Sequence, residues 1–320
     1  MDKVKWGILS TAGINQRALP GAKSSPKVEI VAVGSRDKAR AEAFAQEWEI
    51  PRAYGSYEDL LDDPDVEAIY IPLPNTLHCE WSIKAMEAGK HVLCEKPFDR
   101  NPDNVARAFD AAERTGKLLS EAFMYRHNPQ TKKLKELVDA GAIGELRLVR
   151  CSFSYSMYDE SNIRLRTDVD GGALMDVGCY CISGARLLAG EPERVHGDAW
   201  YGPSGTDWVF TGLMRFPNNV LATFDCGTAM PLRDELEAIG SEGSLFLDDP
   251  WHCRTPGIEL RRNGNAERIE VEVQDSYQLE FENLGDAIRG EAELLLGRED
   301  AVNQARAIQA LHDDAREGKS

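Results

Sequence analysis

Short apolar runs alternate with amphipathic stretches over about the first 120 residues, and this alternation constrains the fold more than any other feature. The runs are rich in β-branched residues and too short for helices. We expect strands at residues 4–10, 28–34, 68–72, 91–94 and 117–120. We expect helices from residue 13 onward and at residues 37–48, 76–88 and 101–115. This alternation predicts an α/β unit with a parallel sheet covered on both faces.

The pattern changes after residue 122, where longer strands follow one another with few helices between them. These strands are expected near residues 145–155, 195–200, 208–215, 220–226 and 235–239. Helices are expected at residues 130–138, 179–188, 277–288 and 301–315. Such a pattern is typical of an α+β domain built on a large, mostly antiparallel open sheet. We therefore predict two domains, residues 1–122 and 123–320. The open sheet face predicts a homodimer or homotetramer.

The net charge and the cysteines restrict the partners and the compartment. The 320 residues include 37 Lys and Arg against 54 Asp and Glu, a formal net charge of −17. Nucleic acids and anionic membranes bind positive surfaces, so we expect neither as a partner. The first residues lack the apolar segment of a signal peptide, and the seven cysteines are an odd number in a chain too large to need disulfides. We expect a cytoplasmic protein with reduced thiols. Cys179 and Cys181 have no second cluster at metal spacing, so no metal site is expected.

The turn after the first strand suits a phosphate-bearing ligand, because a helix N-terminus at this edge of a parallel sheet offers free N–H groups. The dinucleotide-binding fingerprint of Rossmann-like domains has glycine where this chain has Ser10, Ala12 and Asn15. Ser10 and Ala12 are still small enough for a close approach. The expected cofactor contacts here are Ser10, Thr11, Ala12, Gly13, Ile14 and Asn15. A plain strand–turn–helix connection remains the alternative.

The end of the second strand favours NADP over NAD. An NAD site usually has an acidic residue here for the ribose 2′-OH, whereas an NADP site has small or basic residues. Ser35, Arg36 and Lys38 suit a 2′-phosphate, and Arg36 can also stack on the adenine. Asp37 fits better as the N-cap of the next helix, although it keeps NAD open as the second choice.

Three further motifs identify a family. The first is Cys94-Glu95-Lys96-Pro97, the second spans residues 71–78 (IPLPNTLH), and the third spans residues 171–180 (GGALMDVGCY). In this order, after a Rossmann-like unit, they resemble the glucose–fructose oxidoreductase / inositol dehydrogenase (Gfo/Idh/MocA) family over essentially the whole chain. Residues 6–12 and 121–126 resemble the branch with NADP-dependent D-xylose dehydrogenases and dimeric dihydrodiol dehydrogenase. Many relatives have His where this chain has Tyr180.

The resemblance implies that Lys96, Asp176 and Tyr180 are catalytic. Oxidation of an alcohol requires a base for the hydroxyl proton. A nearby lysine ammonium would lower the pKa of a tyrosine, so we expect Tyr180 to be the acid/base and Lys96 to act electrostatically. The reverse assignment stays open. Asp176 lies four residues before Tyr180, on the same face if both are helical, where it can orient the substrate or the lysine.

The resemblance also implies further cofactor and substrate contacts, although some of these residues are equally well explained by a structural or surface role. The cofactor side would add Pro72, Leu73, Asn75, His78, Glu95 and Lys96. The substrate side would comprise Lys96, Tyr125, Arg126, Arg164, Asp176 and Tyr180. His78 is equally well explained as a structural histidine, and Arg164 as a surface arginine. Aromatic core packing is the better explanation for Trp208 and Trp251.

The expected function is an NADP(H)-dependent oxidoreductase acting on a sugar or related polyol, without a metal. The resemblance favours an aldose such as D-xylose, oxidised at C1 to the lactone. One alternative is a ketoreductase of a modified or nucleotide-linked sugar, which predicts an anion pocket with Arg126, Arg164 and Arg166 as candidates. A second alternative is a noncatalytic NADP-binding sensor, which is expected to have lost Lys96 or the pair Asp176 and Tyr180.

Overall fold

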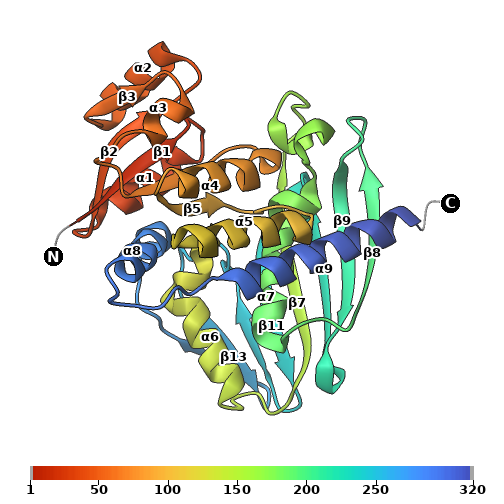
Figure 1. The fold of residues 1–320 in the computed structure, drawn as a ribbon. Helices are drawn as coiled ribbons and strands as arrows, with labels where there is room; N and C mark the ends of the chain where they lie inside the picture. Colours follow the sequence, from red (N-terminus) through yellow and green to blue (C-terminus); the bar gives the residue numbers. More distant parts are fainter. Residues whose placement is uncertain (1–2, 318–320) are drawn as a thin grey trace. The chain divides into compact units, whose positions relative to one another are not determined.

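Residues 3–317 are described by a computed structural model, in which the chain forms two compact units (Figure 1). Unit 1 contains the chain up to His127 together with Asp275–Val302. Unit 2 contains Asn128–Gln274 and the chain from Asn303 onward. Unit 1 extends past the expected boundary at residues 122 and 123 to His127, and it also contains the segment 275–302. The binding roles expected of the two domains remain predictions.

Unit 1 contains a six-stranded parallel sheet, as expected for a Rossmann-like domain. Its strands lie in the order β3-β2-β1-β4-β5-β6. They are β1 Val4–Leu9, β2 Val28–Gly34, β3 Arg52–Tyr54, β4 Ala68–Ile71, β5 His91–Glu95 and β6 Leu119–Ala122. The helices of this unit are α1 Asn15–Ser24, α2 Lys38–Trp48, α3 Tyr57–Leu61, η1 Asn75–Leu77, α4 His78–Glu87, α5 Pro102–Thr115, η2 Met124–His127 and α8 Ser276–Ile288. The carboxyl ends of β1, β2, β4 and β5 carry the predicted cofactor residues.

Polar side chains set the beginnings of several helices in unit 1. The Asp37 carboxylate accepts hydrogen bonds from the main-chain N–H groups of Ala39 and Arg40, at 2.9 and 3.3 Å. Ser56 and Asn101 cap α3 and α5 in the same way. The prediction that Asp37 is an N-cap is confirmed. The helix thus engages one of the two carboxylate oxygens, Asp37 Oδ1.

The helix α8 belongs to the core of unit 1 because its apolar residues pack on the parallel sheet. Phe281 is fully buried, with its ring centroid 4.7 Å from that of Trp6 on β1 and 5.2 Å from that of Tyr70 on β4. Gly21 on α1 lets the two helices approach, since a Cβ there would lie 2.4 Å from Asp275 Oδ1. The sequence pattern predicts the helix but not its partner.

Unit 2 contains an eight-stranded sheet that is mostly antiparallel, as expected. Its order is β14-β13-β12-β11-β7-β10-β9-β8, in which β7 and β10 run parallel and the other neighbours antiparallel. The strands are β7 Leu146–Ser156, β8 Arg194–Tyr201, β9 Asp207–Arg215, β10 Leu221–Gly227, β11 Ala229–Gly240, β12 Ser244–Leu247, β13 Ile258–Arg262 and β14 Asn265–Ile269. The helical elements are α6 Pro129–Asp139, η3 Ile163–Leu165, η4 Thr167–Val169, the π-helix Leu174–Gly178, α7 Cys179–Ala189, η6 Pro217–Asn219 and α9 Arg298–Glu317, which begins in unit 1.

Four strands were not expected from the sequence, namely β3, β12, β13 and β14. β3 has only three residues, and β14 (NAERI) has no apolar alternation because it lies at the edge of the sheet. Pairing with a neighbouring strand, rather than local pattern, makes these segments extended.

One face of the unit 2 sheet is covered by α7 and by the part of α9 that belongs to this unit (Figure 1). Gly197 on β8 makes room for α9, since a Cβ there would lie 2.7 Å from Leu311 O. Along β10, Ala222, Phe224 and Cys226 are buried whereas Thr223 is exposed, so the opposite face of the sheet is open.

Within residues 3–317, no helix combines the length and the apolar character needed to cross a membrane. All seven cysteines are buried free thiols. Burial raises the pKa of Cys94, Cys181 and Cys226 well above the usual thiol value, so these groups stay protonated.

Replacing the Phe281 side chain tests the return of α8 to unit 1. We expect Phe281→Ala to lower the free energy of unfolding by about 3–5 kcal/mol, because it leaves a cavity between Trp6 and Tyr70. Equilibrium urea unfolding followed by tryptophan fluorescence measures this change. The control is Leu295→Ala, whose side chain is exposed, with an expected change within about 0.5 kcal/mol. Equal effects of the two substitutions would contradict the assignment of α8 to this core.

Candidate active site

The turn after β1 is held in an unusual backbone conformation. Ser10 has a φ of 148°, a region that favours glycine, at the first glycine position of the fingerprint. Two side-chain bonds hold it there. Ser10 Oγ donates to the carbonyl of Pro72 at 3.0 Å, and Asn15 Nδ2 donates to the carbonyl of Ser10 at 2.9 Å. The hydrogen bonds of Ser10 and Asn15 thus stabilise a backbone conformation that glycine would adopt without them.

The same turn has features that fit a nucleotide cofactor. The first turn of α1 has no acidic residue and its N-cap makes no side-chain bond, so the positive end of the helix keeps its capacity for an anion. Asn15 Oδ1 is buried and accepts no hydrogen bond from the described residues, which leaves an acceptor for a ligand donor. Of the predicted contacts here, Ser10 and Asn15 are buried and Gly13 is exposed.

The segment after β2 presents Arg36 and Lys38 to solvent and buries Ser35. Ser35 Oγ accepts the N–H of Asp37 at 3.3 Å. Arg36 interacts with the hydroxyl of Tyr57, whose pKa is raised because burial outweighs the arginine charge. The ring of Tyr57 in turn packs edge-on against Trp81, with centroids 5.0 Å apart. Because Asp37 caps α2, the other charged side chains at this strand end are the basic Arg36 and Lys38.

The turn at residues 95–98, called the Lys96 turn below, is fixed by buried acids and a tyrosine. Glu95 Oε1 accepts the hydroxyl of Tyr70 at 2.5 Å, and Glu95 Oε2 accepts the main-chain N–H of Lys96 at 3.2 Å. On the far side of the turn, Glu121 Oε1 accepts the N–H of Phe98 at 2.8 Å. The sequence reasoning missed Tyr70, because a tyrosine inside a strand has no local signal of such a role.

His78 joins the Lys96 turn to the turn after β4. It has no exposed surface, and its Nδ1 and Nε2 lie 2.8 Å from the carbonyl of Pro97 and 2.7 Å from that of Leu73. Burial lowers its pKa. The structure therefore gives His78 a positioning role, which favours the structural alternative over a direct cofactor contact. Pro72 and Leu73 are held in the same network, through the Ser10 and His78 bonds.

In unit 2, the two glycines of the third motif, which directly precede the π-helix region, each make room for a close neighbour. A Cβ on Gly171 would lie 2.6 Å from the carbonyl oxygen of Arg164, and Gly172 has a φ of +130° with Asp207 Oδ1 2.0 Å from its built Cβ. Asp207 Oδ2 accepts the N–H of Leu174, the first residue of the π-helix, at 2.6 Å. The Gly-Gly pair is thus required by close approach at both positions.

Asp176 forms a bonded cluster with Tyr155 and Arg164, called the Asp176 cluster below. The hydroxyl of Tyr155 donates to Asp176 Oδ2 at 2.5 Å, and Arg164 Nε donates to Asp176 Oδ1 at 3.1 Å. Burial and the Asp176 charge raise the pKa of Tyr155, so this hydroxyl remains a donor at ordinary pH. Arg164 was predicted at this site, whereas Tyr155 was missed because it stands in a strand 21 residues away in sequence.

Tyr180, the second residue of α7, is buried against aromatic rings. Its ring centroid lies 5.4 Å from that of Phe153, edge-on, and 6.0 Å from that of Trp251. Trp251 is fully buried and donates its indole N–H to the carbonyl of Ser152 at 3.0 Å. Trp208 is also buried, which agrees with the expected core packing of both tryptophans.

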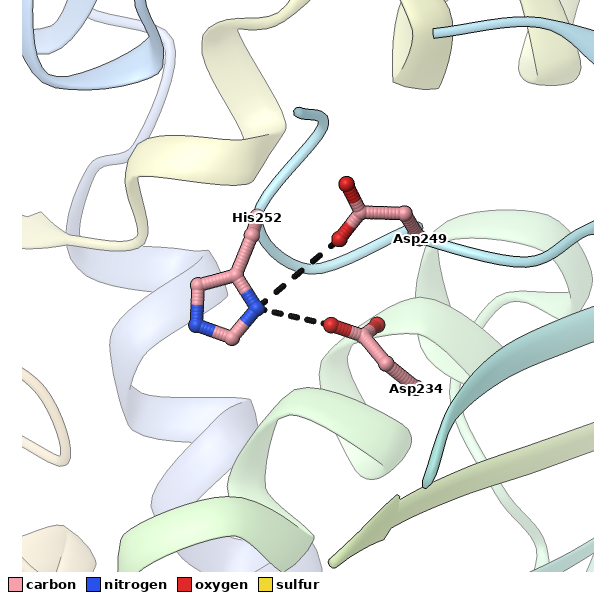
Figure 2. A group of neighbouring side chains, drawn as sticks. All are labelled: Asp234, Asp249 and His252. Atoms are coloured by element: carbon pink, nitrogen blue, oxygen red, sulfur yellow. Dashed lines mark hydrogen bonds and ion pairs between the residues drawn. The ribbon is translucent and has the colours of Figure 1, made fainter. Parts of the chain in front are cut away.

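Next to this aromatic group lie Asp234, Asp249 and His252 (Figure 2), residue types that can bind metals. His252 Nδ1 lies 2.7 Å from Asp234 Oδ2 and 3.9 Å from Asp249 Oδ1. Arg254 Nη2 lies 3.1 Å from Asp249 Oδ1, and the N–H groups of Trp251 and Thr255 bond to the two carboxylates. The carboxylates therefore already bind an arginine and the loop that carries Trp251.

The remaining predicted substrate residues lie in both units. In unit 1, Tyr125 is 1% exposed and Arg126 pairs with Asp300 at 3.3 Å. In unit 2, Arg166 Nε donates to Asp168 at 3.0 Å. The three arginines considered for an anion pocket, Arg126, Arg164 and Arg166, each pair with an aspartate of their own unit.

Comparison with known proteins covers both halves of the chain. Residues 4–123 match the family model described as an oxidoreductase family with an NAD-binding Rossmann fold, and residues 131–246 match the GFO/IDH/MocA C-terminal domain. A D-xylose 1-dehydrogenase (NADP(+)) of Haloferax volcanii is 37% identical, over 98% of each chain. Bovine (Bos taurus) trans-1,2-dihydrobenzene-1,2-diol dehydrogenase is 32% identical, over 88% of this chain and 84% of that one.

A similar solved structure is that of a 3-ketoreductase from Actinomadura kijaniata in complex with NADP and TDP-benzene. It is 31% identical, covers 98% of each chain and superimposes with a TM-score of 0.92. Both halves of the chain thus lead to one family, and the protein is an oxidoreductase of the Gfo/Idh/MocA family.

Proposed function

We propose that the protein is an NADP(H)-dependent oxidoreductase that transfers a hydride between nicotinamide C4 and a CH–OH or C=O carbon of a sugar or related polyol. The preferred substrate is an aldose such as D-xylose, oxidised at C1 to the lactone. The relative of this name from Haloferax volcanii supports this substrate. The observation that carries the proposal is the Asp176 cluster, four residues before Tyr180.

The Asp176 cluster favours an uncharged polyhydroxyl ligand. The Arg164 charge is balanced by Asp176, while the guanidinium is a pure donor and the carboxylate a pure acceptor. Groups of both kinds can bond to sugar hydroxyls, which donate and accept at once. A net cationic pocket, which a diphosphate would require, is not what this pairing provides.

We assign the proton transfer to Tyr180. In the oxidative direction, Tyr180 Oη takes the hydroxyl proton while the C–H electron pair leaves the same carbon as hydride and the C=O bond forms. The chemistry supplied by the nicotinamide is acceptance of that hydride at C4. The role proposed for the Lys96 ammonium is to stabilise the developing oxyanion and the phenolate. Exchange of the two roles between Lys96 and Tyr180 is the alternative.

We assign the cofactor to unit 1. Ser35, Arg36 and Lys38 would bind the 2′-phosphate of NADP, and residues 10–15 would bind the pyrophosphate at the N-terminus of α1. Asn75, Glu95 and Lys96 would lie toward the nicotinamide end. The use of Asp37 as a helix cap supports NADP over NAD, because its Oδ1 accepts two N–H groups of α2.

The second candidate is reduction of a nucleotide-linked keto sugar, which the likeness to the A. kijaniata ketoreductase favours. The pairing of Arg126, Arg164 and Arg166 with aspartates weighs against it. We also propose a homodimer or homotetramer formed through the open face of the unit 2 sheet, and a cytoplasmic location consistent with seven free thiols.

A substrate panel decides between the two candidates. We expect NADP-dependent oxidation of D-xylose or another aldose, followed as absorbance of the reduced nicotinamide. The panel includes keto sugars, diols and a TDP-linked keto sugar, each with NADP(H) and NAD(H). Reduction of the TDP-linked sugar without oxidation of any aldose would reject the aldose proposal in favour of the second candidate.

Removal of the Tyr180 hydroxyl tests the acid/base assignment. We expect Tyr180→Phe to lower kcat about 10²–10⁴-fold, the usual contribution of general acid–base catalysis. NADP binding, measured by calorimetry, is expected to stay unchanged, because the residue lies in unit 2. Tyr158→Phe is the matched control, since that side chain is exposed. Survival of turnover in Tyr180→Phe would transfer the role to Lys96.

Arg36→Ala tests the cofactor assignment. Loss of a charge-assisted hydrogen bond of about 1.5–3 kcal/mol predicts a rise of roughly 10–100-fold in the Kd for NADP. The Kd for NAD is expected to change little, because NAD has no 2′-phosphate. Arg40→Ala, at an exposed position on α2, is the control for loss of a positive charge. Equal weakening of both cofactors would exclude contact between Arg36 and the 2′-phosphate.

A further inference from the structure

The direction of Tyr180 depends on a junction between two kinds of helix. Residues 174–178 form a π-helix, and α7 begins at Cys179, directly before Tyr180. π-Helical turns are rare, and a shift of one residue in helical register rotates a side chain by about 100°. Whatever holds this junction therefore determines where the Tyr180 ring points.

A buried glutamine holds the main chain at this point. Gln304 on α9 is 1% exposed, and its Nε2 donates to the carbonyl oxygen of Cys179 at 2.7 Å. That carbonyl belongs to the peptide group that also contains the nitrogen of Tyr180. The bond thus fixes the peptide plane from which the Tyr180 side chain departs.

The orientation of the Gln304 amide is set by its second neighbour. Arg186 Nη1 donates to Gln304 Oε1 at 2.8 Å, and the other guanidinium nitrogens donate to Glu191 at 2.7 and 2.8 Å. A guanidinium can only donate and a main-chain carbonyl can only accept, so Oε1 faces Arg186 and Nε2 faces Cys179. The Arg186 bond also lowers the pKa of Glu191, despite burial, which keeps that carboxylate ionised.

We propose that Gln304 is a positioning residue for Tyr180, held in place by Arg186 and Glu191. This inference rests on the proposed role of Tyr180 as acid/base. Gln304 acts through the main chain and does not touch the reacting atoms. Its effect is to keep the phenol in the direction needed for proton transfer, where a displacement of about 1 Å can change a rate 10²-fold.

Two substitutions separate positioning from general stability. Gln304→Met removes both bonds with little change in volume. Gln304→Glu keeps an acceptor for Arg186 but has no donor for Cys179 O, because a glutamate beside an arginine stays ionised. We expect both variants to lose about 10–100-fold in kcat, with KM for NADP within about twofold of the wild type. Gln309→Met, at a half-buried position of the same helix, is the control with wild-type kcat.

A spectroscopic readout follows Tyr180 without turnover. The chain has nine tyrosines, and 13Cζ labelling gives one NMR signal for each, with Tyr180 assigned as the signal missing in Tyr180→Phe. We expect the Tyr180 signal to shift or broaden in both Gln304 variants and to stay unchanged in Gln309→Met. Thermal melts verify folding. If Gln304→Met does not fold, the Glu variant carries the test.

The outcomes separate this inference from the proposed function. A folded Gln304 variant with wild-type kcat and an unchanged Tyr180 signal would overturn the positioning role. Near-wild-type kcat in Gln304→Glu with a loss in Gln304→Met would also overturn it, because the Arg186 contact would then be what matters. A wild-type enzyme inactive on the whole panel, with the Tyr180 signal altered in both variants, would reject the proposed function and support the positioning.

Discussion

The bond between Asp176 and Arg164 is the interaction on which the candidate site residues of unit 2 depend. A largely buried carboxylate is stable only with donors, and Asp176 takes one from Arg164 and one from Tyr155. The loop that carries Arg164 packs against residue 171, where a Cβ would lie 2.6 Å from the Arg164 carbonyl oxygen, whereas Gly172 makes room for the Asp207 carboxylate. The spacing of this motif therefore has one structural reason. The close packing at the two glycines positions the groups around Asp176.

The Lys96 turn in unit 1 follows the same principle with different residues. Its main chain is bonded by Glu95, Glu121 and His78, all of which are buried. Glu95 is itself bonded by Tyr70 from the neighbouring strand. The proposed chemical groups thus stand at chain positions fixed by buried polar side chains. Such bonds are worth more away from water, and a missing partner costs more there.

The sequence predicts those features that depend on neighbouring residues, such as the beginnings of helices. Asp37 and Asn101 could be predicted from the sequence as a cap and a helix start, because a short polar side chain followed by a helical pattern satisfies orphan N–H groups. The return of α8 to unit 1 was not readable, because Phe281 meets Trp6 across 275 positions of sequence. The roles of Tyr155 and Gln304 could not be predicted for the same reason. Their roles consist of single bonds to distant residues, which leave no periodic pattern.

The excess of acidic residues explains why the candidate arginines are paired. With 54 acidic residues against 37 basic ones, a cation near a ligand is readily paired, and Arg126, Arg164 and Arg166 are each paired with an aspartate. In the proposed function, discrimination among substrates then rests on hydrogen bonding rather than on net charge. Hydrogen bonding discriminates strongly, because a ligand that lacks the matching hydroxyl leaves Asp176 or Arg164 with an unmet bond in a partly dry site. In the proposed function, the position and stereochemistry of the hydroxyl groups, more than the size of the sugar, therefore determine which substrate binds.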